Sequence, residues 1–212
     1  MDRPSEPPLW TSEFLCFNVA VFLAFINMAV FFSFEEYLRT LPIAPQWFGL
    51  LMGLFSAVAL VLRPFISPFS HAGNARSWIS LGTLGVMAAL AAYGWAGTLG
   101  TMAALRLFHG TAHLVLATAL LTVIVQRIPP GRSGQAFGLL SIITLLPYAV
   151  VPPVLQILME RLGGYPQVLI FFAGTMTLIF PLIFLKGSGQ DPGDGGRPGR
   201  LSPTEIRQNL QE

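Results

Sequence analysis

Three basic side chains recur at helical spacing inside one long apolar segment of the sequence. Arg106 is followed by His109 and His113, at spacings that place all three on one face of a helix. A charge in hydrocarbon costs about 2.5–3.5 kcal/mol on insertion scales, so an ionisable residue there is a functional candidate. Arg106 could attract an anionic group, and His109 could exchange a proton near neutral pH. The structural alternative is that Arg106 anchors near the interface or pairs with Glu35 or Glu36, while the histidines bond to backbone or hydroxyl groups.

His109 and His113 also have the i, i+4 spacing of helical metal ligands. A zinc site needs at least a third protein ligand, and no further His, Cys or carboxylate follows at ligand spacing. The single cysteine, Cys16, has no partner for a disulfide or a metal site. We therefore expect no metal and no cofactor.

Three residues with amide side chains are candidates inside other apolar segments. Asn18 and Asn27 share one segment, nine residues apart and about 90° apart around the helix. Gln156 is the comparable residue of a later segment. Each could bind a solute in a cavity, or hold one helix to the next by hydrogen bonds worth about 0.6–2 kcal/mol.

Catalytic motifs are absent from the sequence. It has no paired carboxylates inside the apolar segments, no Gly-x-Ser-x-Gly turn and no phosphate-binding Gly-x-x-x-x-Gly-Lys loop. We therefore do not expect an enzyme.

The elements that must position these residues are six apolar stretches. Hydrophobic residues make up 53% of the chain and charged ones 10%, with a mean hydropathy of +0.65, which excludes an ordinary soluble globule. The net charge of +2 is not gathered into a basic stripe, so no nucleic acid is expected. Each stretch is near the roughly 20 residues that cross a bilayer, and residues 99–126 form the longest. The stretches are residues 14–34, 46–62, 77–96, 99–126, 136–159 and 165–185.

Arginine and lysine positions predict how the spans are oriented. With alternating helices, nine of the twelve basic residues fall on one side, two on the other and Arg106 within a span. The positive-inside rule then places both termini in the cytoplasm, as an even number of spans requires. We expect a multi-pass protein of the plasma (inner) membrane. The four tryptophans, Trp10, Trp47, Trp78 and Trp95, fall near span ends.

Small residues and prolines indicate where helices touch and bend. Gly49, Gly53 and Ala57 recur every four residues in the second span, and Gly134 and Gly138 repeat this spacing in the fifth. Such stripes let helix backbones approach closely, so they predict packing faces. Prolines are expected to interrupt two spans, at Pro147, Pro152 and Pro153 in the fifth and at Pro181 in the sixth.

Composition divides the chain into three parts. Residues 1–13 are polar and read as a cytoplasmic N-terminal segment rather than a signal peptide. Residues 14–186 form the six-helix transmembrane domain. Residues 187–212 are rich in Gly, Pro, Asp and Arg, which predicts a flexible cytoplasmic tail.

Three motifs resemble those of the major facilitator superfamily. The segment 62–76 resembles its cytoplasmic loop between the second and third helices, with Arg63, Pro64 and Arg76 matching and Ser67, His71 and Asn74 departing. The segment 106–110 is similar to its Arg-x-x-x-Gly pattern, and 132–138 to its entry into the fifth helix.

The resemblance implies an all-α bundle of six transmembrane helices, equivalent to the N-terminal half of a twelve-helix transporter. It implies secondary transport of a small solute, with Arg106 facing the central cavity and residues 187–212 placed like the linker between halves. A second six-helix half, from a separate chain or a second copy, is then an expected partner besides the lipid bilayer. The alternative is a non-transporting remnant or assembly module, in which Arg106 and the asparagines are structural.

Overall fold

The computed structural model describes residues 9–71, 73–129 and 131–184, which form helices and no strand. All six predicted spans are present as helical segments long and apolar enough to cross a membrane. The predicted tail, 187–212, lies outside the described residues, as does most of the N-terminal segment. The six segments are Ser12–Arg39, Pro45–Phe69, Ala75–Trp95, Leu99–Val125, Ser133–Leu162 and Tyr165–Phe184.

Several segments consist of an α-helix continued by a shorter helical piece. The α-helices are α1 (Ser12–Ala29), α2 (Phe34–Arg39), α3 (Phe48–Ile66), α4 (Ala75–Ala92), α5 (Leu99–Val125), α6 (Ser133–Leu162), α7 (Tyr165–Met176) and α8 (Ile179–Phe184). The 3₁₀ turns are Val30–Ser33, Pro45–Trp47, Ser67–Phe69 and Tyr93–Trp95.

Side-chain and glycine caps set where the helices begin and end. The Thr11 hydroxyl accepts a hydrogen bond from the backbone N–H of Phe14 at the start of α1, and Thr98 with Thr101 forms a capping box at the start of α5. Gly163 ends α6 in the left-handed conformation, with φ of 91°, and its N–H bonds to the carbonyl of Met159. The caps at Thr98 and Gly163 lie in short turns that join neighbouring spans.

Two expected span lengths are wrong. The second span does not stop before Arg63, since α3 continues through Pro64 to Ile66 and then as a 3₁₀ turn to Phe69. The longest span is the fifth, at 30 residues, rather than the fourth, at 27. In both cases helical structure runs past the apolar stretch, because the polar residues at its ends lie in helix termini rather than in loops.

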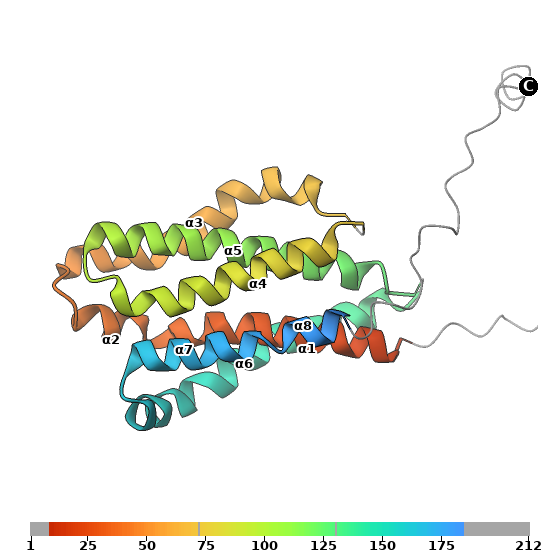
Figure 1. Ribbon diagram of the computed structural model, residues 1–212. Helices are drawn as coiled ribbons and strands as arrows, with labels where there is room; N and C mark the ends of the chain where they lie inside the picture. The colour runs from red at the N-terminus through yellow and green to blue at the C-terminus, as the bar shows by residue number, and fades with distance from the viewer. Residues whose placement is uncertain (1–8, 72, 130, 185–212) are drawn as a thin grey trace, which may run out of the picture.

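The prolines act differently in the fifth and sixth spans. Helix α6 is continuous through Pro147, Pro152 and Pro153, so the expected interruption is wrong. The C-terminal end of α6 does turn, and it is seen nearly end-on in Figure 1. The sixth span does break, between α7 and α8 at residues 177–178. Residue 177 lies four positions before Pro181, where the proline ring would clash with the carbonyl of a regular helix.

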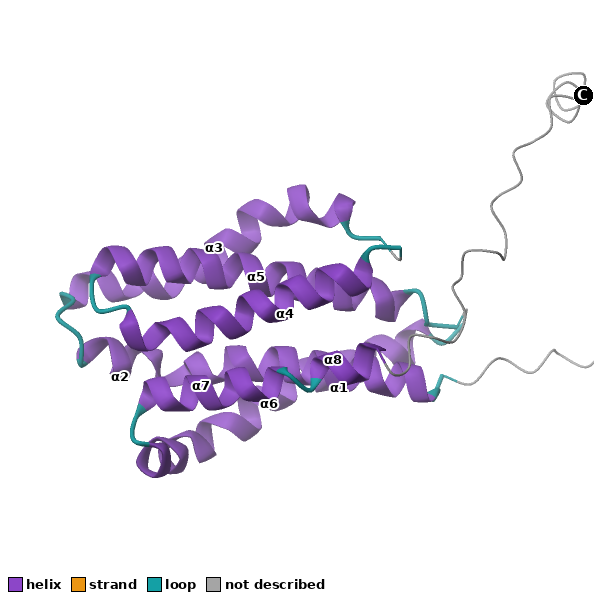
Figure 2. Cartoon of the chain, in the orientation of Figure 1, coloured by secondary structure: helices purple, strands orange, loops and turns teal. Residues whose placement is uncertain are grey.

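Helices α1 and α5 form the centre of an elongated bundle. Helix α5 packs against α3, α4 and α1, and α1 also packs against α6, α7 and α8. Figure 1 shows α3, α4 and α5 along one side and α1, α6, α7 and α8 along the other, and Figure 2 shows that short loops join them. Helices α3 and α6 therefore flank the bundle.

Glycines mark the closest helix contacts, but not the ones that spacing predicts. A Cβ at Gly82 of α4 would lie 2.6 Å from the Leu116 backbone nitrogen, and one at Gly85 would lie 2.8 Å from the Ala112 Cβ. A Cβ at Gly49, Gly53, Gly134 or Gly138 meets nothing within 4 Å. Within the bundle these four glycines make no close helix contact, because they face outward on the flanking helices α3 and α6, so the predicted packing faces stay a prediction.

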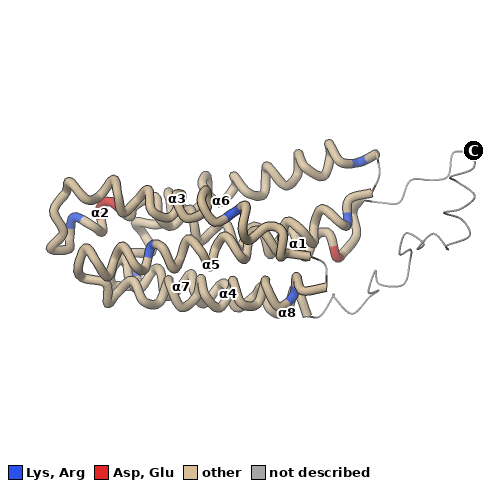
Figure 3. The backbone as a smooth tube through the Cα atoms, turned by 90° about the horizontal axis from the view of Figure 1, so that it is seen from above, with Lys and Arg blue, Asp and Glu red and all other residues tan. Residues whose placement is uncertain are grey.

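Charged residues are sparse and lie mostly toward the two ends of the bundle (Figure 3). At one end the Arg127 guanidinium bonds to the Glu13 carboxylate at 3.2 Å and lies 4.5 Å from the Phe17 ring centroid. This contact joins the start of α1 to the end of α5, so the two central helices are antiparallel, as expected.

Candidate functional site

The central polar contact of the bundle is made by the Asn27 side chain of α1. Its Oδ1 lies 2.8 Å from His109 Nε2, and its Nδ2 lies 3.2 Å from His113 Nδ1 and 2.8 Å from the Ala24 carbonyl. Asn27 and His109 are fully buried and His113 is 7% exposed. One amide therefore joins α1 to two turns of α5, with its oxygen and both N–H groups paired.

Hydrogen-bond chemistry fixes the direction of each contact in this Asn27 cluster. The amide oxygen only accepts, so His109 Nε2 donates to it, and the amide nitrogen only donates, so His113 Nδ1 accepts. Tyr93 Oη lies 3.2 Å from His109 Nδ1, which accepts from the phenol when the ring is neutral. The result is a directional chain from Tyr93 through His109 and Asn27 to His113.

The Asn27 cluster does not resemble a metal site. The amide lies between the two imidazoles and takes the ring nitrogens that face it. Within residues 9–71, 73–129 and 131–184, no group of three His, Cys, Asp or Glu side chains is placed to hold an ion. The chemistry available here is hydrogen bonding between neutral groups.

Arg106 lies one turn of α5 from His109 and is 5% exposed. Its Nε donates to the Leu51 carbonyl at 2.9 Å and its Nη2 to the Met52 carbonyl at 3.1 Å. The guanidinium is enclosed by three phenylalanine rings, whose centroids are 4.7–5.2 Å from Cζ. These rings belong to Phe31, Phe34 and Phe55.

The alternative in which Arg106 pairs with Glu35 or Glu36 is wrong. Glu35 bonds instead to Arg39 on its own helix. In the described residues the carboxylates in ion pairs are Glu35 and Glu13, and neither partner is Arg106. The positive charge is held by carbonyl dipoles and aromatic faces, which explains how it is retained in an apolar bundle.

Gly110 explains how Arg106 reaches the second span. A Cβ at Gly110 would lie 3.0 Å from the Phe55 carbonyl oxygen and 3.3 Å from its Cα, so a larger residue would push α3 away from α5 by a few tenths of an ångström. Arg106, four residues earlier on the same face, then reaches the carbonyls of α3 one turn away. In this chain the glycine of the Arg-x-x-x-Gly pattern allows α3 and α5 to pack closely, and the arginine bonds to α3 on the same face.

Asn18 and Gln156 lie apart from the Asn27 cluster. Asn18 is 2% exposed, its Nδ2 donates to the Phe14 carbonyl of its own helix at 2.7 Å, and its Oδ1 has no partner. Gln156 is exposed on α6 and donates to Glu160 at 3.4 Å. Of the sequence candidates, the structure joins Asn27, His109 and His113 by hydrogen bonds and places Arg106 one turn of α5 away.

In the Arg63–Arg76 segment, which runs from the end of α3 to the start of α4, Asn74 organises the connection. Its Oδ1 accepts from the His71 backbone N–H at 2.9 Å, and its Nδ2 donates to the Phe69 carbonyl at 2.6 Å. Arg63, Pro64 and Arg76 are exposed. Arg63 and Pro64 line an open groove of about 570 Å³ on α3 together with Ser56 and Leu60.

Sequence reasoning missed Tyr93 and the three phenylalanines around Arg106. Tyr93 reaches His109 from the end of the preceding span, and the rings come from two other segments. An excess of aromatic residues around 31–37 was the available signal, but it does not say which ring faces which charge.

The chain belongs to the Major Facilitator Superfamily, which its sequence matches over residues 17–210. No curated protein matched the sequence. The match, the six apolar helices and the helical bundle together define an integral, multi-pass membrane protein of a transporter family. The expected family and fold are therefore confirmed.

Proposed function

We propose that this chain is one six-helix half of a secondary active transporter for a small solute, in the plasma (inner) membrane with both termini cytoplasmic. Its partner is a second six-helix bundle, supplied by a separate chain or by a second copy. The solute path runs between the two bundles, whose rocking exposes it to either side in turn.

The observation that carries this proposal is the uneven burial of the six spans. Only 17% of the positions in the apolar windows of the second and fifth spans are buried, against 56% for the first and 61% for the fourth. The outward faces of α3 and α6 carry small residues at helical spacing, which favour helix contact over contact with lipid. We call these faces the small-residue stripes: Gly49, Gly53 and Ser56 on α3, and Gly134, Gly138 and Ser141 on α6.

The polar residues divide between the inside of the bundle and these flanks. The Asn27 cluster and Arg106 hold α1, α3, α4 and α5 together, which supports a half that moves as one body. Gln156 continues the stripe of α6 and would face the second bundle. Arg106 is 5% exposed, so it would act beside the path, by holding α3 against α5 through its two carbonyl contacts.

Flux into proteoliposomes tests the proposal, with and without a co-expressed second bundle. We expect flux only in the assembled form, and loss of flux in Arg106→Met with the bundle still folded. Arg106 forms no ion pair with a described carboxylate, so its replacement by an apolar residue leaves no unpaired buried charge, and this variant separates function from folding. Equal flux in Arg106→Met would contradict the role of Arg106.

Assembly is tested separately by filling one stripe. Gly53→Leu should abolish association with the second bundle and leave the isolated bundle folded, because nothing in the bundle lies within 4 Å of that Cβ. Leu60→Ile, an exposed change that keeps side-chain volume on the same helix, is the control.

A non-transporting assembly module is the second candidate. The observation that favours it is that Arg106 and Asn27 already have protein partners within the bundle. Association without flux in any pairing would support the module and contradict the transporter.

A further inference from the structure

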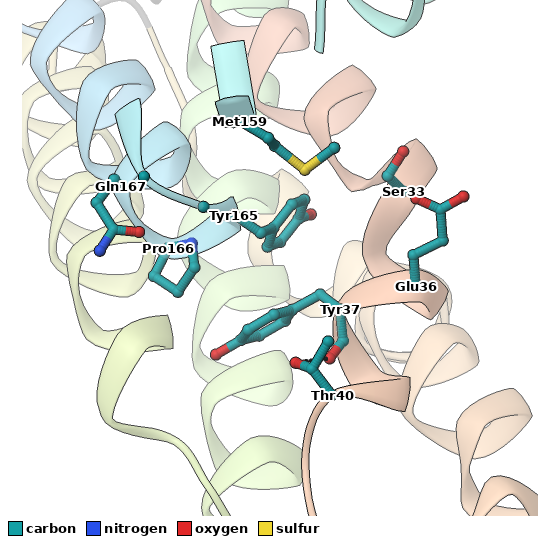
Figure 4. A pocket seen from close by; sticks show the side chains of 10 residues that line it. Ser33, Glu36, Tyr37, Thr40, Met159, Tyr165, Pro166 and Gln167 are labelled. Atoms are coloured by element: carbon teal, nitrogen blue, oxygen red, sulfur yellow. Dashed lines mark hydrogen bonds between the residues drawn. The ribbon is translucent and has the colours of Figure 1, made fainter. Parts of the chain in front are cut away.

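A pocket of about 470 Å³ opens at the end of the bundle opposite the start of α1 (Figure 1). One wall is the end of the first span, with Ser33, Glu36 and Thr40. The other wall is the turn from α6 to α7, with Met159 and Gln167 (Figure 4). None of these residues belongs to the Asn27 cluster, so the pocket is a separate site.

Two tyrosine rings form the floor of the pocket. Tyr37 and Tyr165 are stacked, with ring centroids 5.0 Å apart and planes at 25°. Both hydroxyls are bonded away from the pocket, Tyr37 Oη to the Tyr93 carbonyl at 3.0 Å and Tyr165 Oη to the Val30 carbonyl at 3.1 Å. The pocket is therefore lined by the small exposed part of the two rings, 8% for Tyr37 and 5% for Tyr165, and not by their hydroxyls. An aromatic ring attracts a cation that lies over its face.

The charge at the rim of the pocket is the Glu36 carboxylate. Glu36 is exposed and forms no ion pair with any described residue. Its neighbour Glu35 is not part of the pocket lining and is paired with Arg39, so that arginine is also engaged. A negative charge beside aromatic surface and a Met159 thioether favours a cation with an apolar body.

We propose that this pocket binds an organic ammonium ion that carries a small apolar or aromatic substituent. The substituent lies on the Tyr37 and Tyr165 rings, and the ammonium group lies between the aromatic surface and the Glu36 carboxylate. Ser33 and Gln167 supply further hydrogen-bonding groups at the two walls. An anion of the same shape would be repelled by Glu36.

Ligand-observed NMR with phenethylammonium tests the proposal, using the full chain in nanodiscs of zwitterionic phosphatidylcholine and empty nanodiscs as the baseline. We expect saturable binding to the unmodified protein, and about fivefold weaker binding to Glu36→Gln. Glu35→Gln is the matched control, because it removes the adjacent carboxylate outside the pocket and should leave the affinity unchanged. Neutral phenylacetamide should bind no better than it does to empty nanodiscs.

Three results would overturn the proposal: no saturable binding, equal affinity in Glu36→Gln, or an equal loss in both glutamine variants, which would indicate surface charge alone. Circular dichroism of each variant checks that it is folded, which an exposed substitution should not alter. The measurement needs no transport and no second bundle, so its outcome is independent of the flux experiments.

Discussion

At the scale of single residues, the two asparagines of α1 show how the same side chain takes different roles. Asn27 has all its polar atoms paired, and two of its partners lie on another helix. Asn18 bonds only to its own helix and leaves its Oδ1 unpaired. A helix contact is therefore stabilised by one asparagine and not by the other.

Asn27→Leu should destabilise the bundle by about 1–3 kcal/mol, because it leaves His109 Nε2 and His113 Nδ1 buried without partners. Reversible unfolding in mixed micelles measures this change. Asn18→Leu is the control and should shift stability by less than about 0.5 kcal/mol, since it removes an oxygen that already lacks a partner. Equal losses in the two variants would contradict the assignment.

At the scale of elements, the absence of a side chain sets the helix spacing. The contact of α4 with α5 depends on Gly82 and Gly85, and the contact of α3 with α5 depends on Gly110. The glycines with the regular four-residue spacing, by contrast, are open. A four-residue glycine spacing identifies a helix face on which close contact is possible. Whether the contact forms depends on where the neighbouring helix lies.

Gly82→Ala should separate α4 from α5 and destabilise the bundle by about 1–3 kcal/mol, since the new methyl group would overlap the Leu116 backbone. Gly53→Ala adds the same methyl group to open space and should be neutral, or stabilising by up to about 1 kcal/mol through helix propensity. Thermal unfolding of both variants in one detergent makes the comparison. If Gly53→Ala lowered stability as much as Gly82→Ala, the assignment of Gly82 to the close contact between α4 and α5 would be contradicted.

Pro181→Ala should close the break between α7 and α8. The new amide N–H can donate to the carbonyl of Thr177, which a proline at position 181 cannot do. Hydrogen exchange followed by mass spectrometry should then show slower exchange around residues 177–181. Unchanged exchange would mean that another contact holds the break open.

At the scale of the whole molecule, the bundle has a buried centre and two uncovered flanks. Helices α1 and α5 are enclosed by their neighbours, whereas α3 and α6 present the small-residue stripes outward. Arg127 and Glu13 join the central pair at one end. The interior of the bundle is therefore closely packed, whereas few positions on the second and fifth spans are covered by the rest of the chain.

Orientation in the membrane is tested by cysteine labelling in a Cys16→Ser background. With both termini cytoplasmic, Gly97→Cys in the turn before α5 should react with an impermeant maleimide on intact cells. Ser133→Cys at the start of α6 should react only after the cells are opened. The reverse pattern would contradict the predicted orientation and the placement of the basic loops.

The sequence was sufficient to predict the spans, because each is a long apolar run and needs no knowledge of its neighbours. It also identified Arg106, His109 and Asn27 as candidates, since polar groups stand out in apolar helices. It could not show that Asn27 bridges both histidines or that three phenylalanines enclose Arg106. Those contacts join residues up to 86 positions apart, and they depend on how the helices rotate against one another.

The bridge made by Asn27 also bears on how the protein is made. Its histidine partners follow 82 and 86 residues later in the chain, so the first helix leaves the ribosome long before they exist. Until then the Asn27 amide has only a carbonyl of its own helix as a hydrogen-bond partner. The unpaired amide groups cost free energy once the helix is in lipid. Arrival of the fourth helix relieves that cost, because its two histidines pair with the Asn27 amide.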